Sequence, residues 1–274
     1  NGQDDGNNPV EVNGQALFEN EIQVEGHPWY INQEYNNHRD ATYEEILHLV
    51  HDYGIGIDGH NSFPGAMPEY QSEIREAQKI ALSNNLWGID AERWINELID
   101  ENSLTQEYLA ALIDSYYGLW GAWTDSNTHG MWGIYVAKTR DEILTEDPIG
   151  AEIMNNKFFH PHLTYNARID SSFNGNFSLR FDSSKPYTNH SQYLKDITLL
   201  GSNDISVSIN PLDNNITGNQ GINTVIFSGN SSEYIINISD NKASVIDKIS
   251  DRDGINILQN IEKLEFKDQT IELN

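Results

Sequence analysis

The last third of the chain carries the pattern that most restricts the fold. After Tyr193 the apolar runs are short, and clusters of Asn, Asp and Gly separate them. Such runs are typical of strands joined by tight turns. In residues 213–223 (DNNITGNQGIN), Gly and Asn or Asp take the turn positions and an apolar residue points inward, which is the rhythm of a nonapeptide β-roll repeat. Gly and Asn tolerate the positive φ that we expect in tight parallel turns. We therefore predict a β-rich module over residues 193–274.

The part of the chain before this module has helical periodicity. Apolar residues recur at helical spacing, and two helix starts carry a capping-box pattern, Thr42 with Glu45 and Ser103 with Gln106. We predict an α+β protein, with a mainly α-helical domain over residues 1–192 that begins with an extended segment. Its first and fourth helices are expected to pack together. The predicted helices cover residues 42–53, 69–84, 90–100, 103–117, 139–144 and 149–157, and the predicted strands 163–169 and 177–181.

Composition excludes several classes of function. The net charge is −26, so a polyphosphate backbone would be repelled and nucleic-acid binding is not expected. No stretch approaches the ~20 apolar residues that span a bilayer, so no membrane span is predicted. The chain has no cysteine, which excludes thiol catalysis and Cys-ligated zinc. The many acids either keep the protein soluble in salt or bind divalent cations.

The predicted helix over residues 42–53 concentrates groups that can bind a metal ion. At 100° per residue Glu44, His48 and His51 lie within about 60° of one another on the helix surface. Two imidazoles and a carboxylate can share one ion. Glu45 lies on the neighbouring face. The alternatives are that Glu45 is only a capping residue and that both histidines are hydrogen-bonded in the interior.

The predicted helix over residues 103–117 adds two acids and a tyrosine. Glu107 and Asp114 share one side of the helix, and alanines lie between them. Small residues let a neighbouring helix or an ion approach closely, so both acids are predicted as metal ligands. The alternative for Glu107 is an exposed acid that the helix macrodipole favours near a helix N-terminus. Tyr117 is predicted to donate to an oxyanion that develops during a reaction.

The motif in the first helix resembles a degenerate zincin helix, in which His-Glu-x-x-His supplies two zinc ligands and a general base. Glu44 stands in the place of the first ligand, Glu45 in that of the base, and His48 in that of the second ligand. In gluzincin-type peptidases a downstream helix supplies a Glu as third ligand, and Glu107 resembles that arrangement. The resemblance implies a zinc-dependent hydrolase that acts on a peptide or another extracellular polymer.

Residues 195–274 resemble the C-terminal region of serralysin-type and other RTX secreted proteins. The elements FSGNSSEY (227–234) and RDGINILQNIEKLEFKD (252–268) occur together and in order, although the glycine repeat is reduced to about one copy. The resemblance implies secretion by a type I machinery and calcium shared between coils of a β-roll. The predicted calcium ligands are Asp213, Asn215 and Asn219.

Two classes of function are left open. The first is a secreted metal-dependent hydrolase, possessing the zinc site described above. The second is a non-enzymatic extracellular protein that uses calcium for binding or adhesion. A glycan-active enzyme is a further alternative, because tryptophans and a pair of carboxylates suit a sugar substrate. The tryptophans of such a sugar platform would be Trp87, Trp94, Trp120, Trp123 and Trp132. Further histidines that could bind a metal are His60, His160 and His162.

Overall fold

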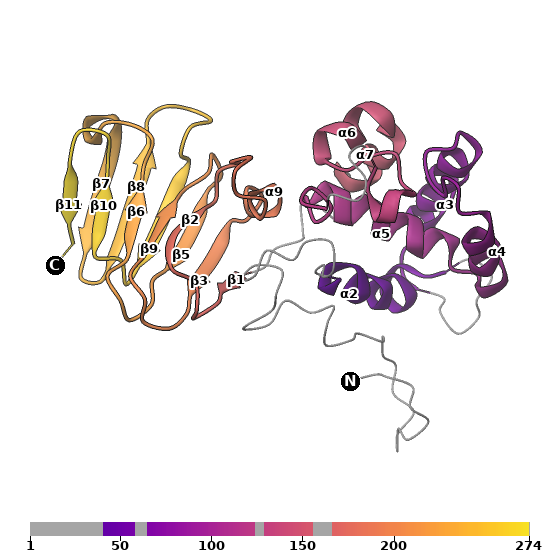
Figure 1. Ribbon diagram of the computed structural model, residues 1–274, viewed down its shortest axis with the longest axis horizontal. Helices are drawn as coiled ribbons and strands as arrows, with labels where there is room; N and C mark the ends of the chain where they lie inside the picture. Colours follow the sequence, from indigo (N-terminus) through magenta and orange to yellow (C-terminus); the bar gives the residue numbers. More distant parts are fainter. Residues whose placement is uncertain (1–40, 58–64, 124–128, 156–165, 274) are drawn as a thin grey trace, which may run out of the picture. The chain divides into compact units, whose positions relative to one another are not determined.

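The computed structural model describes residues 41–57, 65–123, 129–155 and 166–273, so His60, His160 and His162 lie outside the described residues. The described chain divides into two compact units, a helical unit over 41–155 and a β unit over 166–273 (Figure 1). Helices dominate the first unit and strands the second, which confirms the predicted α+β class.

All six predicted helices are present, and their described ends lie within two residues of the predicted ones when the π-helix after Val50 is counted with the first helix. The short helices at 131–133 and 188–191 were not predicted. The first helix is α-helical to Val50 and continues as a π-helix, because the N–H of Gly56 bonds to the carbonyl of His51. The elements of the helical unit are α2 (Thr42–Val50), η2 (His51–Ile55), α3 (Pro68–Ser83), α4 (Glu92–Glu101), α5 (Leu104–Tyr116), η3 (Met131–Gly133), α6 (Arg140–Glu146) and α7 (Pro148–Asn155).

Both predicted capping boxes are wrong. The N-cap residue of α2 is Ala41, and no side chain caps this helix. Ser103 is the N-cap of α5 as expected, but its side chain makes no capping bond. Gln106, the expected partner, donates a hydrogen bond to Asp52 instead. A contact between helices therefore replaces the local cap.

Helix α5 is the core of the helical unit. Every residue from Tyr108 to Tyr116 is buried, and α2, α3, α4, α6 and α7 all contact this helix (Figure 1). Tyr43 at the start of α2 stacks on Tyr117 at the end of α5, with ring centroids 6.0 Å apart. Asp52, just after α2, contacts Gln106 at the start of α5. The two helices therefore pack antiparallel. Their contact confirms the prediction that the first and fourth helices pack together.

The β unit consists of stacked coils that alternate between two sheets. From β1 to β6 each strand joins the opposite sheet from its predecessor, and neighbours within a sheet are parallel. Ser206 pairs with Thr224, so this coil has 18 residues, the length of two nonapeptides. The strands are β1 (Asn166–Ile169), β2 (Gly175–Ser178), β3 (Asp196–Leu199), β4 (Ile205–Ser208), β5 (Asn214–Thr217), β6 (Thr224–Ile226), β7 (Tyr234–Ser239), β8 (Lys242–Asp247), β9 (Ile255–Gln259), β10 (Lys263–Glu265) and β11 (Thr270–Glu272).

The β unit begins before residue 193. Strand β1 pairs with β3 and β2 pairs with β4, so residues 166–178 belong to the same sheets as the strands that follow. The expected boundary at 192/193 therefore falls inside this unit. The short helix α9 (Thr188–Ser191) interrupts the strand pattern there, which explains why composition placed the boundary too late.

Asparagine side chains tie successive coils together at their turns. The amide of Asn203 donates to the carbonyls of Ser171 (3.1 Å) and Phe173 (2.8 Å) in the preceding coil. The amide of Asn219 in turn donates to the carbonyls of Leu200 (3.1 Å) and Asn203 (3.0 Å). We call Asn203 and Asn219 the asparagine ladder. It satisfies turn carbonyls that no strand neighbour can reach.

The glycines of the repeat serve close approach between coils. Gly218 and Gly221 do not have the positive φ that the sequence led us to expect. A Cβ at Gly218 would lie 1.8 Å from the carbonyl oxygen of Asn260, and one at Gly221 would lie 2.5 Å from that of Asn203. Only glycine allows the neighbouring turns to lie this close.

Replacing Asn219 by Asp should weaken the β unit and make it respond to calcium. The carboxylate cannot donate to the two carbonyls and repels them, so we expect the free energy of unfolding to fall by about 1–3 kcal/mol. Millimolar calcium should restore much of this loss, because a carboxylate beside turn carbonyls is a calcium ligand set. Thermal unfolding followed by circular dichroism measures both effects, with the exposed Asn237→Asp as control. Equal stability of the two variants would contradict the role of the ladder.

Candidate metal centre

Two carboxylate side chains and one imidazole meet where α2 packs on α5. One ligand atom from each of Glu44, His48 and Glu107 lies within 4.8 Å of the other two, and within the described ranges no further group of three is found. Glu44 and His48 are one turn apart on α2, and Glu107 is in the first turn of α5. Ala110 and Ala111, one turn beyond Glu107 on α5, are fully buried.

The imidazole of His48 has different neighbours on its two nitrogens. Nδ1 lies 3.5 Å from Oε2 of Glu45, and Nε2 lies 3.7 Å from Oε1 of Glu107. The residue is 7% exposed, and Nε2 is buried with no hydrogen bond. A buried polar atom without a hydrogen bond requires an explanation, and an ion is one of the few that apply.

The charge around His48 is strongly negative. Burial alone would lower its pKa, but the hydrogen bond with Glu45 and the carboxylates of Glu107 and Glu44 outweigh burial and raise the pKa to about 9. The imidazole of the metal-free protein is therefore protonated at neutral pH. A divalent cation would take over the role of this proton in balancing the carboxylates, so binding would release protons.

The donor set fits a first-row transition ion. Two carboxylates and one imidazole suit zinc, iron or manganese, and catalytic zinc sites also have three protein ligands. Glu44 is buried, whereas the side chain of Glu107 is 21% exposed. The group is therefore most accessible from the side of Glu107, where further ligands or a substrate could approach.

His51 takes part in a different contact. It is fully buried, and its Nε2 lies 2.5 Å from Oε1 of Gln71. The amide of Gln71 donates to the hydroxyl of Thr105 (3.2 Å), so its oxygen accepts from His51. This chain links η2, α3 and α5, and His51 is not part of the three-residue group. Its role as a ligand stays a prediction.

Asp114 and Tyr117 also lie outside the three-residue group. Asp114 is buried seven residues beyond Glu107, about 10 Å along the helix axis. Tyr117 is about 15 Å from Glu107 along the same axis. Its burial raises its pKa to about 12, against a weaker opposing effect of Arg140. The roles of Asp114 as a ligand and of Tyr117 as an oxyanion donor stay predictions.

Two contacts of this region were not predicted from the sequence. One is the position of Glu45 beside Nδ1 of His48, and the other is the bond from His51 to Gln71. A signal existed for Gln71, because it lies on the buried face of α3 together with Ile74 and Gln78. A glutamine in an apolar helical stripe indicates a buried hydrogen bond.

The three predicted calcium ligands all make hydrogen bonds within the β unit. Asp213 accepts from the N–H of Ile255 (2.8 Å), and the amide of Asn215 donates to Asp196 (2.6 Å). Asn219 belongs to the asparagine ladder. Calcium binding at these residues stays a prediction.

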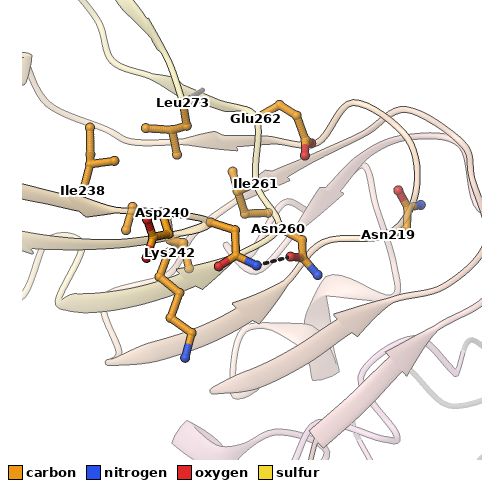
Figure 2. A pocket seen from close by; sticks show the side chains of 11 residues that line it. Asn219, Ile238, Asp240, Lys242, Asn260, Ile261, Glu262 and Leu273 are labelled. Atoms are coloured by element: carbon orange, nitrogen blue, oxygen red, sulfur yellow. Dashed lines mark hydrogen bonds between the residues drawn. The ribbon is translucent and has the colours of Figure 1, made fainter.

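The β unit also contains a cavity of about 310 Å³ between the β7–β8 turn and the segment after β9. Figure 2 shows Ile238 and Leu273 on one wall and Asp240, Lys242 and Asn260 on the other. The amide of Asn241 donates to Asn260 (3.2 Å) at the edge of the cavity. The cavity is distinct from the three-residue group, whose ligands belong to the helical unit.

The tryptophans of the helical unit do not form one exposed platform. Trp87 and Trp120 are buried, and Trp123 is nearly so, whereas Trp132 is 52% exposed. Trp87 packs edge-on against Tyr108 of the core, with ring centroids 5.7 Å apart. These side chains are mainly packing residues.

No protein-family model matches the chain, and comparison with curated proteins and with solved structures found no match. None of the described helices has the length and apolar character needed to cross a membrane. The geometry of the three-residue group is therefore the main evidence for a function.

The pKa of His48 provides a test of this electrostatic description. In metal-free protein, imidazole NMR should give a pKa near 9, and Glu107→Gln should lower it because a neighbouring negative charge is lost. Since the folded pKa is above the unfolded value of 6.5, this group stabilises the fold fully below pH 6.5, and the contribution is lost as the pH rises through 9. The exposed Glu101→Gln is the control. A pKa at or below 6.5 would contradict the description.

Proposed function

We propose that the chain is a secreted metal-dependent hydrolase, with zinc bound by Glu44, His48 and Glu107. The observation that carries the proposal is the approach of these three ligand atoms to within 4.8 Å, with the buried Nε2 of His48 facing Glu107. The resemblance of the α2 motif to a degenerate zincin helix supports hydrolysis as the reaction.

The chemistry of the site follows from its charge and accessibility. A bound divalent ion polarises a carbonyl oxygen and lowers the pKa of water towards neutrality. The two carboxylates and the imidazole would bind and orient that ion, and a substrate would reach it from the side of Glu107, the most exposed of the three side chains at 21%. With a net charge of −26 the protein disfavours polyanions, so the proposed substrate is a neutral or cationic peptide or another extracellular polymer.

The β unit supports the proposed location outside the cell. Its coil of 18 residues matches the length of two nonapeptide repeats, and residues 195–274 resemble the tails of RTX proteins. A type I secretion machinery would then be a partner of the chain. Calcium would act on the β unit at Asp213 and Asn215.

Metal content tests the proposed site directly. Protein purified without added metal and dialysed against a weak chelator should retain about one transition-metal ion per chain, because two carboxylates and an imidazole from two packed helices supply three ligands. His48→Ala should retain none, whereas His129→Ala, a change elsewhere in the helical unit, should retain the ion. Elemental analysis measures the ratio. Calcium alone, or no metal, would contradict the proposal and favour a non-enzymatic binding or adhesion protein.

Hydrolysis is a separate expectation. The zinc-loaded protein should cleave members of a fluorogenic peptide library, and His48→Ala should reduce cleavage by more than about 100-fold because the ion is lost. His129→Ala should retain full activity. A His48→Ala protein that cleaves as fast as the wild type would exclude this site as the source of the activity.

A further inference from the structure

We propose that Glu45 is the positioning residue of the metal centre: it holds His48 so that Nε2, and not Nδ1, binds the ion. The proposal rests on the proposed metal site. It also assigns to Glu45 a role different from the general base that the zincin resemblance implies.

The geometry separates the two edges of the imidazole. Oε2 of Glu45 lies 3.5 Å from Nδ1, while Nε2 faces Glu107 at 3.7 Å. A metal-binding imidazole is neutral, so it carries one proton, and that proton must be on the nitrogen that does not bind the ion. A carboxylate beside Nδ1 accepts a hydrogen bond from this proton and thereby fixes both the tautomer and the orientation of the ring.

The helix itself sets this arrangement. Glu45 and His48 are three residues apart on α2, so their side chains are neighbours on one face. Both are largely buried, with side chains 16% and 9% exposed, and a carboxylate contact is stronger where water is excluded.

The same geometry argues against Glu45 as general base. A base must lie within hydrogen-bond reach of the proton that it removes, near the ion and the substrate. The carboxylate of Glu45 is on the Nδ1 edge, and the imidazole ring separates it from the ion that Nε2 would bind.

The metal affinity of Glu45 variants distinguishes a positioning role of Glu45 from a role as general base. Using cobalt and zinc titrations of the full chain, we expect Glu45→Ala to weaken binding by about 10- to 100-fold, because the imidazole loses its hydrogen-bond acceptor. Glu45→Gln retains an acceptor oxygen of the same shape, so its affinity should remain within about tenfold of the wild type. Glu101→Ala, at the exposed end of α4, is the matched control and should bind like the wild type.

Two further readouts separate positioning from base catalysis and from loss of structure. The imidazole nitrogen NMR signals of zinc-loaded protein should show His48 protonated at Nδ1. At saturating zinc, peptide cleavage by Glu45→Ala and Glu45→Gln should approach the wild-type rate. Loss of cleavage in Glu45→Gln with unchanged zinc affinity would identify Glu45 as the base and overturn the proposal.

The failure of this inference and the failure of the proposed function give different results. A wild-type protein that binds no transition metal overturns both. A wild-type protein that binds zinc, together with a folded Glu45→Ala variant of equal affinity, overturns only the positioning role.

Discussion

The close antiparallel packing of α2 on α5 is the contact on which the rest of the helical unit depends. Tyr43 stacked on Tyr117 fixes one end of the pair, and the hydrogen bond from Gln106 to Asp52 connects the other. Helix α5 is buried on nearly all sides, so the other helices of the unit pack around it. The same approach brings a carboxylate of α5 against a carboxylate and an imidazole of α2. Fold and candidate site are thus consequences of one helix pair.

In the β unit, asparagine side-chain amides stabilise turns at which the RTX resemblance would predict bound calcium. A calcium ion between coils balances carboxylates and binds turn carbonyls. Asn203 and Asn219 provide N–H donors to the turn carbonyls of the neighbouring coil without adding charge. These bonds hold the turns of successive coils close together. Gly218 and Gly221 remain where a side chain would collide with the next turn.

Much of the fold could be predicted from the sequence, because helix positions follow from apolar periodicity within α2, α3 and α5. The capping boxes were predicted wrongly, and for α5 the reason is that Gln106 bonds to Asp52 across the helix pair instead of capping its own helix. At the candidate site, Glu44, His48 and Glu107 were among five predicted ligands, together with His51 and Asp114. Helical spacing places Glu44 beside His48, and small residues next to Glu107 indicated a close approach. The partners of His51 and Glu45 could not be predicted, because the orientation of an imidazole ring depends on neighbours from other elements. Gln71 of α3 is such a neighbour for His51. Which nitrogen of His48 lies beside Glu45 likewise depends on the orientation of that ring.

The central claim is that this helix pair binds a transition-metal ion through Glu44, His48 and Glu107. Anomalous diffraction at the zinc edge, from crystals of the protein grown with zinc, tests it most directly. The account predicts one strong peak among these three side chains, at about 2.0–2.2 Å from Nε2 of His48 and from an oxygen of each glutamate. A peak bound by other residues, or none in a well-ordered helix pair, would contradict it.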